Sequence, residues 1–348
     1  MRVRITSIYL LAVCSFSLLA QDYKENFKNA KDDEEKISIL EEIKKSGDAK
    51  QSKFLISVLM QGESSKLRSA AAAALGSVKQ GVDELQKAFD TDDIYVREAS
   101  MEALAEIGNQ KSLAHFEKAY KDKNEKIRDS AIKGLSKTAK LGNASMLRDA
   151  LNSKNKDTQW YALEGIAKIK AHEEWKHVKK FCSDANVDLV TACLRVAGQV
   201  ELNDALAELE KNLASPNEDI SKTAIEALGN YKAEKVIPTL IRFKRDNPNH
   251  TALAEVGKIL KKAKAAKQYA IVNVADSLNI RSEANDRSSV VASLKGNAVV
   301  EILKREAKKY IVKNAKGEEM ENFWYNIKTE DGKKGFIFGE FIQVIDSY

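Results

Sequence analysis

Histidine and cysteine are the side chains best suited to chemistry in this sequence, and it holds few of either. The chain has 348 residues, with four histidines and three cysteines. His172 and His177 are five positions apart, so they do not share a helix face, and no cysteine or carboxylate pattern completes a zinc-ligand set with them. We therefore expect no metal site and no cofactor.

Motifs for nucleophilic, phosphate or glycosidic chemistry are also missing. A cysteine hydrolase needs a nucleophilic thiol paired with histidine, whereas Cys182 and Cys193 fall where a repeated pattern otherwise places apolar or small residues. None of the sixteen glycines forms a GxxxxGK or GxGxxG phosphate loop. Carboxylates are abundant, but none stands out as an acid–base pair. The sequence predicts no catalytic residue and a protein that is not an enzyme.

The elements that carry these residues follow a repeat of about 31 residues, which is typical of stacked helical units. Arg68 marks the first unit, and the equivalent positions are Arg97, Arg128, Gln159, Val190, Ser221 and, less regularly, Asn249. Four residues before the regular positions stand side chains able to cap a helix N-terminus, namely Ser64, Asp93, Asn124, Asn155, Asn186 and Asn217. Each unit therefore begins a helix at its capping residue.

Apolar residues in each unit are spaced for two helices. In the first unit Leu67, Ala71 and Leu75 are four residues apart and form one stripe of a helix. A second stripe lies upstream of each cap, as Leu85 and Phe89 illustrate. Small residues three positions after each landmark allow neighbouring helices to approach closely. The pattern predicts about seven helical hairpins stacked into an α-solenoid.

This pattern resembles the HEAT-like repeats first described in phycobilisome lyases. Arg68 to Gly76 reads RSAAAAALG, Tyr95 to Leu104 reads YVREASMEAL, and Thr223 to Gly229 reads TAIEALG. The resemblance covers residues 50 to 265 and implies the repeat fold without lyase activity, because such repeats occur in many proteins that are not lyases. The landmark arginine is lost after the third unit, so we expect no continuous polar ladder in the second half.

The first twenty residues have the composition of a secretory signal. Arg2 and Arg4 form a basic start, residues 5 to 19 are mainly apolar, and Ala20 precedes a polar chain. We expect residues 1–20 to be cleaved near Ala20 and the protein to be exported to the periplasm or cell envelope, with no transmembrane span afterwards. An uncleaved anchor and a lipoprotein modified at Cys14 are the alternatives.

Three further segments follow the signal. Residues 21–50 are expected to form N-terminal capping helices, including one from Asp33 to Gly47, and residues 51–266 form the repeat solenoid. From residue 267 to 348 the periodicity becomes alternating, which predicts an all-β module. Its short β-rich runs are Tyr269–Val274, Val290–Leu294, Ala298–Leu303, Lys309–Val312, Phe323–Lys328 and Gly335–Ile337. Five or six such strands predict a small barrel.

The C-terminal segment resembles a bacterial SH3-like domain over its whole length. The turn signals Lys316-Gly317 and Asp331-Gly332 lie between the runs. The other matching elements are Leu278-Asn279-Ile280-Arg281, Ser289 to Asn297, Trp324-Tyr325-Asn326-Ile327, Gly335-Phe336-Ile337 and Phe341-Ile342. Family members commonly have tryptophan where Phe336 stands, and the stretch from Glu306 to Asn322 is longer than usual. The resemblance implies a module that binds a peptidoglycan peptide or another envelope component.

Exposed aromatic side chains on a small barrel can line a shallow groove for an extended peptide. The ligand-binding candidates are Tyr310, Trp324, Tyr325, Phe336 and Phe338. The alternative is that these rings form the core of the barrel, because a module of this size needs most of its aromatic residues there.

Trp160 and Tyr161 are the partner-binding candidates on the solenoid. Trp160 follows the landmark Gln159 directly, at a position that is polar in the other units, so its indole is expected on a solvent-facing helix. Aromatic side chains dominate the energetics of many protein interfaces. The alternative is packing of Trp160 against the loop of the next repeat.

Cys182 and Cys193 flank the loop between the helices of one repeat. An oxidising compartment would join them if their separation permits. Both positions are apolar or small in the other units, for example Leu151 and Ala162. We therefore expect buried free thiols that act as core residues, with a disulfide as the alternative.

The charge of the chain argues against nucleic acid as a partner. The formal net charge is +6, and loss of Arg2 and Arg4 with the signal leaves +4. A nucleic-acid surface usually needs a denser basic face. The run of lysines from Lys258 to Lys267 is better explained as the solvated face of the last helix and its linker.

These observations favour an exported, non-enzymatic scaffold or adaptor of the bacterial cell envelope. Its solenoid would bind a protein partner, and its SH3-like barrel would bind a peptide or a peptidoglycan component. The alternative is an accessory or catalytic component of cell-wall remodelling. Export to the cell surface, to bind host or matrix proteins, is a third hypothesis.

Overall fold

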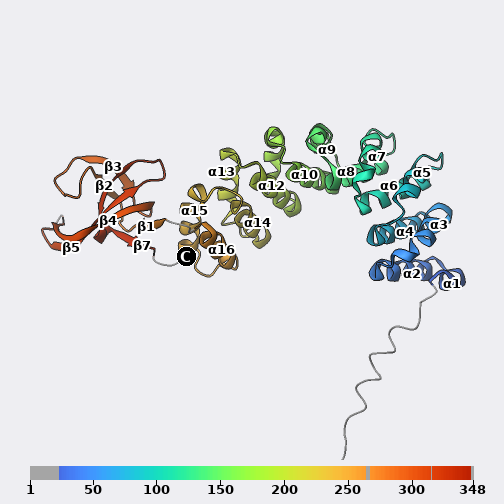
Figure 1. Cartoon of the computed structure of the whole chain (residues 1–348), viewed down its shortest axis with the longest axis horizontal. Helices are drawn as coiled ribbons and strands as arrows, with labels where there is room; N and C mark the ends of the chain where they lie inside the picture. The colour runs from blue at the N-terminus through green and yellow to red at the C-terminus, as the bar shows by residue number, and fades with distance from the viewer. Residues whose placement is uncertain (1–22, 264–266, 315, 346–348) are drawn as a thin grey trace, which may run out of the picture. The chain divides into compact units, whose positions relative to one another are not determined.

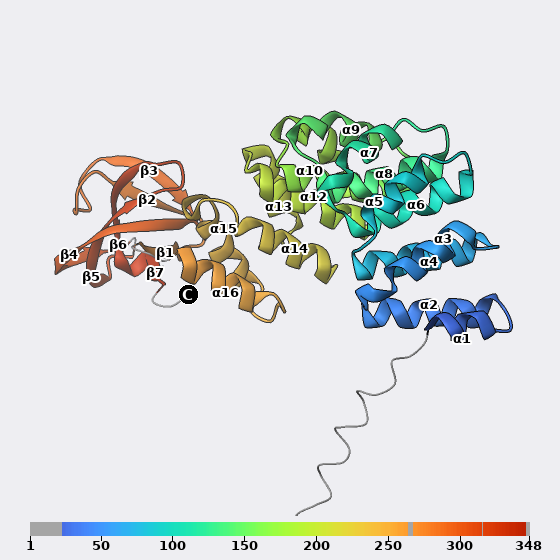
Figure 2. The ribbon, with the colours of Figure 1, turned by 45° about the vertical axis from the view of Figure 1, so that its right-hand side comes forward.

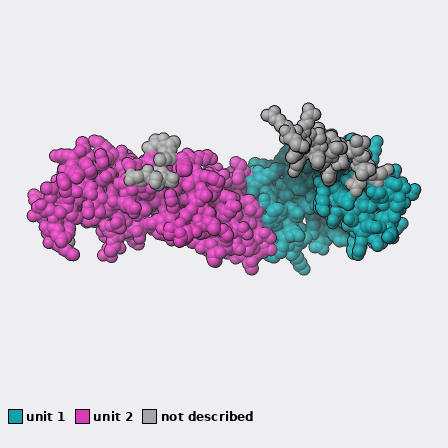
Figure 3. All heavy atoms as spheres, turned by 90° about the horizontal axis from the view of Figure 1, so that it is seen from below, with its two compact units in different colours: residues 1–169 teal, residues 170–348 magenta. Residues whose placement is uncertain are grey.

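The computed structural model describes residues 23–263, 267–314 and 316–345. The expected signal segment, with Cys14 and Ala20, lies outside this range. Within it, no helix combines the length and apolarity needed to span a membrane. The chain divides into two compact units, Met1–Ile169 and Lys170–Tyr348 (Figure 3).

The first unit is built from helices alone, in the part of it that the structure describes (Figures 1 and 2). Its α-helices are α1 (Tyr23–Asn29), α2 (Asp33–Ser46), α3 (Ser52–Gln61), α4 (Ser65–Val78), α5 (Val82–Phe89), α6 (Ile94–Ile107), α7 (Leu113–Ala119), α8 (Glu125–Thr138), α9 (Ala144–Ala150) and α10 (Lys156–Ile169). The short 3₁₀ turns η1 (Ala49–Gln51), η2 (Gln110–Ser112) and η3 (Leu141–Asn143) lead into α3, α7 and α9. The helices α2, α4, α6, α8 and α10 pack in succession, so the second helix of each hairpin forms one row.

The second unit continues with helical hairpins before its strands begin. Its helices are η4 (His172–Glu174), α11 (Trp175–Val178), η5 (Lys179–Ser183), α12 (Val187–Val200), α13 (Asn203–Asn212), α14 (Glu218–Leu228), α15 (Ala233–Asp246) and α16 (Leu253–Ala263). In the described residues α3 to α16 thus form seven successive pairs. The predicted α-solenoid of helical hairpins is confirmed.

The predicted capping residues start the second helix of every regular unit. Asp93, for example, accepts hydrogen bonds from the amides of Tyr95 and Val96 at 2.8 and 3.2 Å. The other predicted caps that accept such bonds are Ser64, Asn124, Asn155, Asn186 and Asn217. Asp32 caps α2 in the same way. These side chains satisfy amides that the helix itself leaves free.

Close packing within the hairpins depends on small residues. The predicted small positions, such as Ala71, Ser100 and Ala131, are fully buried. At Gly134 in α8, a Cβ would lie 2.3 Å from the nearest ring carbon of Phe116 in α7. Only glycine therefore permits the distance between these two helices.

The landmark column has a structural role that the sequence did not reveal. In three units its side chain donates a hydrogen bond to the carbonyl eight residues earlier, at the end of the preceding helix. The pairs are Arg97 with Phe89, Gln159 with Leu151, and Ser221 with Leu213. Arg128 instead donates to the carbonyls of Asp122 and Lys123, both at 2.8 Å. Glutamine and serine make the same bond in two later units, but valine at position 190 has no side-chain donor, so the polar contacts form no continuous ladder in the second half, as expected.

Cys182 and Cys193 are joined by a disulfide, with their Cα atoms 5.2 Å apart. Both side chains are buried in the core, as expected. The prediction of free thiols is wrong, because the turn η5 brings Cys182 directly against α12, which carries Cys193. The repeat pattern located both residues in the core but could not give their separation.

The C-terminal module is a curled, antiparallel seven-stranded sheet with the order β3-β2-β6-β5-β4-β1-β7 (Figures 1 and 2). Its strands are β1 (Gln268–Val272), β2 (Ser277–Arg281), β3 (Val290–Lys295), β4 (Val299–Lys313), β5 (Glu319–Lys328), β6 (Lys334–Phe338) and β7 (Ile342–Val344), and the turn η6 (Gly339–Phe341) precedes β7. Its core cluster consists of Ala270, Val272, Ile280, Val300, Ile302, Ile327 and Ile337. The predicted SH3-like fold is confirmed.

The strands differ from the sequence prediction in two respects. The structure adds β2 (Ser277–Arg281) and β7 (Ile342–Val344), for which no run was predicted. The runs Ala298–Leu303 and Lys309–Val312 belong to a single strand, β4, whose pairing with β5 is interrupted by two register shifts. The segment that looked unusually long is thus an extended hairpin. The predicted turns hold, since Gly317 and Gly332 adopt φ values of 81° and 88°, which favour glycine.

Candidate functional site

The face of the sheet opposite the core cluster carries a second group of buried aromatic residues. Neighbouring residues in a strand point to opposite faces, so Phe338 lies opposite the core residue Ile337. Trp324 of β5 pairs directly with Phe338 of β6, and their ring centroids are 5.4 Å apart. Phe341 follows at 6.3 Å from Phe338. Three rings therefore gather outside the hydrophobic core.

These rings line a hollow of about 590 Å³, the indole hollow. Its other lining residues come from the segment before β2, from β2, from the loop after it and from the β4–β5 hairpin. They are Val274, Ser277, Leu278, Asn279, Arg281, Asp286, Val312, Lys313, Asn314, Lys316 and Met320. The surface is thus aromatic and aliphatic, with polar groups between, as in many ligand sites.

The indole nitrogen of Trp324 is the unusual group in this hollow. The Trp324 side chain is only 3% exposed, and its Nε1 has no hydrogen-bond partner within the described residues. An indole N–H can only donate, and leaving a buried donor unsatisfied costs about 1–3 kcal/mol. Trp175, which is 4% exposed, donates its Nε1–H to Asp204 Oδ2 at 3.1 Å. The contrast marks the Trp324 N–H as a buried donor whose hydrogen bond is missing.

Cationic side chains outnumber anionic ones around the indole hollow. Arg281, Lys313 and Lys316 line it together with a single acid, Asp286. Arg281 is held in place because its Nη1 donates to the carbonyl of Ser288 at 2.8 Å. The site therefore combines an apolar floor, a hydrogen-bond donor and an excess of positive charge.

The structure brings two of the five predicted ligand-binding residues, Trp324 and Phe338, into this hollow. Tyr325 faces the other way and packs against the core cluster. Phe336 is half-buried and does not line the hollow. Tyr310 is half-buried, with the Lys308 ammonium 5.0 Å from its ring centre. The period-two alternation of the strands could have separated Tyr325 from Trp324.

Sequence reasoning missed Arg281 and Phe341 as lining residues. Both lie in motifs that carry the resemblance to SH3-like domains, so their positions along the chain were available. Their approach to Trp324 depends on the pairing of β2 with β6 and on the η6 turn. Neither feature has a strong local signal.

Trp160 and Tyr161 of α10 form an edge-on pair with ring centroids 5.1 Å apart. Both side chains are half-buried. The Lys133 ammonium lies 5.5 Å from the centre of the Tyr161 ring. Lys133 is paired in turn with Glu106. The pair leaves part of each ring available at the surface of the first unit.

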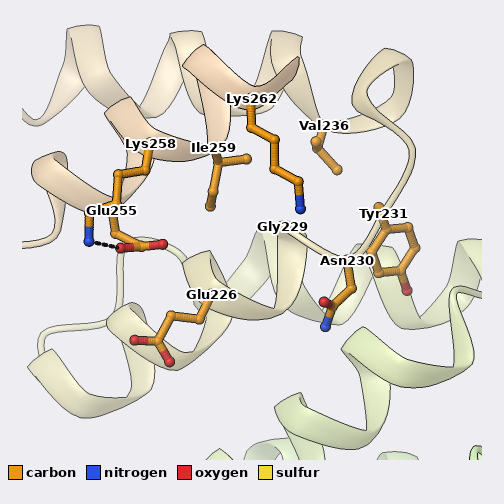
Figure 4. A pocket seen from close by; sticks show the side chains of 9 residues that line it. All are labelled: Glu226, Gly229, Asn230, Tyr231, Val236, Glu255, Lys258, Ile259 and Lys262. Atoms are coloured by element: carbon orange, nitrogen blue, oxygen red, sulfur yellow. Dashed lines mark hydrogen bonds and ion pairs between the residues drawn. The ribbon is translucent and has the colours of Figure 1, made fainter.

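A further hollow of about 470 Å³ lies between α14 and α16 (Figure 4). Glu255 and Lys258, on α16, form an ion pair of 2.9 Å, and the Lys262 side chain extends towards α14. Tyr231 uses its hydroxyl to donate to the carbonyls of Ala197 and Leu202. Because no lining residue holds a buried polar atom without a partner in the described chain, this hollow is a weaker candidate than that at Trp324.

None of the four histidines lines the indole hollow. His172 and His177 are exposed, and His250 contacts the Ser221 hydroxyl through Nε2 at 3.2 Å. The described part of the chain holds no group of three or more histidine, cysteine, aspartate and glutamate side chains placed to bind a metal ion. The aromatic, aliphatic and cationic groups that line the indole hollow are suited to noncovalent binding.

Comparisons with known proteins agree with this architecture. Residues 52–136 match the family described as HEAT repeats, and residues 276–343 match the bacterial SH3 domain. No curated protein matches the chain. Among solved structures, YibA from Escherichia coli is 16% identical, with a TM-score of 0.50 over 70% of this chain and 92% of that chain.

A second solved structure is the complex of CpcE and CpcF of phycocyanin lyase from Nostoc sp. PCC7120. It is 18% identical, with a TM-score of 0.41 over 61% of this chain and 94% of that chain. Identities this low speak only to fold. The family matches and the observed elements show HEAT repeats followed by a C-terminal bacterial SH3 domain.

Proposed function

We propose that this protein is an exported, non-enzymatic scaffold of the bacterial cell envelope. Its SH3 domain binds a peptide or peptidoglycan component in the indole hollow, and its HEAT repeats bind a protein partner. The observation that carries the proposal is the buried, unpartnered indole N–H of Trp324 beside the rings of Phe338 and Phe341.

The chemistry of the hollow favours a peptide. A backbone or side-chain carbonyl would accept the Trp324 N–H, and an apolar side chain would cover Phe338 and Phe341. The basic edge at Arg281 and Lys313 would attract carboxylates, which peptidoglycan stem peptides carry. Small barrels of this kind commonly bind extended chains in shallow grooves.

Two features support export. The apolar segment after Arg2 and Arg4 has the composition of a secretory signal. The disulfide between Cys182 and Cys193 is buried, and such bonds persist mainly in oxidising compartments. Both features agree with a location in the periplasm or cell envelope.

The test is retention of the purified full-length mature protein on insoluble peptidoglycan. Trp324→Phe keeps an aromatic ring but removes the N–H, so we expect the retained fraction to fall about five- to tenfold. Tyr310→Ala changes an aromatic residue outside the indole hollow and should bind as the unaltered protein does. Equal retention of Trp324→Phe and the unaltered protein, with both folded, would refute the site.

The same incubation tests the alternative of a role in cell-wall remodelling. Release of soluble muropeptides by the mature protein would show hydrolysis, contrary to the non-enzymatic role. Retention without release supports the scaffold. No retention of the unaltered protein on peptidoglycan or on a synthetic stem peptide would count against the ligand class.

A further inference from the structure

Arg68 departs from the behaviour of its own repeat column. Arg97, Gln159 and Ser221 each bind the carbonyl eight residues earlier, and Arg128 binds two carbonyls of the preceding loop. The guanidinium of Arg68 makes no hydrogen bond or ion pair with any described residue, and its Nε is buried without a partner. A guanidinium carries five N–H donors in a planar fork, and a buried one is stabilised when an acceptor such as a carboxylate takes its hydrogen bonds.

Arg68 instead lies over the ring of Tyr95, with its Cζ 5.8 Å from the ring centre. Tyr95 is 58% exposed, although other aromatic residues of the described chain are buried or half-buried. The cation and the ring belong to neighbouring helices, α4 and α6, of the first unit. Together they offer a donor fork next to an uncovered aromatic surface.

These two residues line a hollow of about 430 Å³ on α4, α6 and α8, the Arg68 hollow. Its other lining residues are Ser65, Lys66, Ser69, Glu98, Ala99, Glu102, Lys126, Asp129 and Ser130. Three cations and three carboxylates therefore face the hollow. What they can bind depends on which of these charges are already engaged within the protein.

Each carboxylate of the Arg68 hollow already accepts a hydrogen bond from another side chain of the protein. Glu98 accepts from Asn124 Nδ2 at 2.6 Å and from Lys126 at 3.5 Å. Glu102 accepts from the Ser69 hydroxyl at 3.0 Å. Asp129 accepts from the Thr158 hydroxyl at 2.7 Å and from Asn155 Nδ2 at 3.0 Å.

The cations of the Arg68 hollow make fewer hydrogen bonds and ion pairs within the described chain than the carboxylates do. Neither Lys66 nor Arg68 has a hydrogen bond or ion pair from its side chain to any described residue, and Lys126 has only the long contact to Glu98. Burial also raises the pKa of Glu102, so the ionised form of this carboxylate is disfavoured relative to an exposed one. The charged groups left without a close partner in this hollow are therefore cationic.

We propose that the Arg68 hollow binds a carboxylate-bearing peptide segment of a partner protein. The Arg68 fork takes the carboxylate of an acidic residue, and an adjacent aromatic or aliphatic side chain stacks on Tyr95. Lys66 adds a longer-range attraction at the edge. This assignment deepens the proposed function, on whose protein-binding role for the HEAT repeats it rests, by naming the site and the chemistry of the partner.

The test uses the full-length mature protein and a fluorescein-labelled peptide, Gly-Glu-Phe-Glu-Gly amide, in a fluorescence anisotropy titration. The matched probe carries glutamine in place of both glutamates. We expect the acidic peptide to bind at least about tenfold more tightly than the glutamine peptide, because charge-assisted hydrogen bonds are the stronger ones. The difference should shrink as salt is added.

The matched variants are Arg68→Gln and Arg128→Gln. Glutamine at 159 already fills this column, and Arg128 is engaged with loop carbonyls, so Arg128→Gln should bind the acidic peptide unchanged. Arg68→Gln should weaken it at least about tenfold. Tyr95→Ala replaces an exposed side chain, so it gives a second test if Arg68→Gln does not fold.

Three results would overturn the assignment: equal binding of the two peptides, unchanged affinity of folded Arg68→Gln and Tyr95→Ala, or no binding of the acidic peptide to the unaltered protein. The peptidoglycan assay separates this proposal from that for the SH3 domain. Arg68→Gln should leave peptidoglycan retention unchanged, and Trp324→Phe should leave peptide anisotropy unchanged.

Discussion

The Trp324 indole N–H and the Arg68 Nε are buried without the hydrogen-bond partner that the same group has elsewhere in the chain. Trp175 has Asp204, and Arg97 has the Phe89 carbonyl. In each case the same chemical group is at least partly buried, with a hydrogen-bond partner at one position and without one at the other, so burial alone does not explain the missing bond. Residue types alone could not reveal this difference, because the sequence pattern treats Arg68 and Arg97 as equivalent.

A further test at the residue scale concerns Glu102. Burial raises the pKa of Glu102 in the folded protein, despite the hydrogen bond from Ser69. Its ionised form therefore costs stability at neutral pH, and this cost disappears as the pH falls through the raised folded pKa. We expect Glu102→Gln to raise the melting temperature at pH 7, with a gain that diminishes towards about pH 4.

Glu106 is the matched control, with the opposite sign. Burial alone would raise the pKa of Glu106, but the hydrogen bond and charge of Lys133 and the charge of Lys137 outweigh it, so the pKa is lowered. Its stabilising contribution is present above the unfolded pKa and is lost as the pH falls through the lowered folded pKa. Glu106→Gln should lower the melting temperature at pH 7. If the two variants shift it in the same direction, the electrostatic account is wrong.

At the scale of elements, predictability followed the strength of the local signal. Helix starts were predicted from capping residues such as Asp93 and Asn124, because their hydrogen bonds are made within one turn. The single strand β4 was predicted as two runs. Its two register shifts interrupt the alternation of apolar and polar residues by which strands are predicted, so the strand could not be followed across them. The disulfide was predicted only as the alternative, and of the residues that line the indole hollow only Trp324 and Phe338 were named in advance, because both features depend on distances between elements.

Helix packing is testable at Gly134. An alanine there would place its Cβ 2.3 to 2.5 Å from three ring carbons of Phe116, so α7 and α8 must separate or the ring must move. We expect Gly134→Ala to destabilise the protein by about 1–3 kcal/mol in urea unfolding. Gly142→Ala is the control, because its Cβ would meet nothing within 4 Å. Equal unfolding midpoints for the two variants would show that the α7–α8 contact relaxes freely.

At the scale of the whole molecule, the proposed function assigns recognition to two kinds of module. The HEAT repeats present hollows on helical faces, such as that at Arg68 and Tyr95, and the SH3 domain presents the aromatic hollow at Trp324. A scaffold requires both sites to be occupied independently. The fold class and module order were predictable from the repeat and strand patterns. The Arg68 hollow was not, and the indole hollow was predicted only through Trp324 and Phe338, because each hollow is assembled from several elements.

The compartment of the molecule is tested through its disulfide. If the protein is exported, Cys182 and Cys193 should be oxidised in protein recovered from its native host, and alkylation of the denatured chain should label neither thiol until a reductant is added. Closing this short loop typically stabilises a protein by about 2–4 kcal/mol, so reduction should lower the melting temperature. The double variant Cys182→Ala and Cys193→Ala should melt at a similarly reduced temperature and be insensitive to reductant. Free thiols in the native protein would contradict both the bond and export to an oxidising compartment.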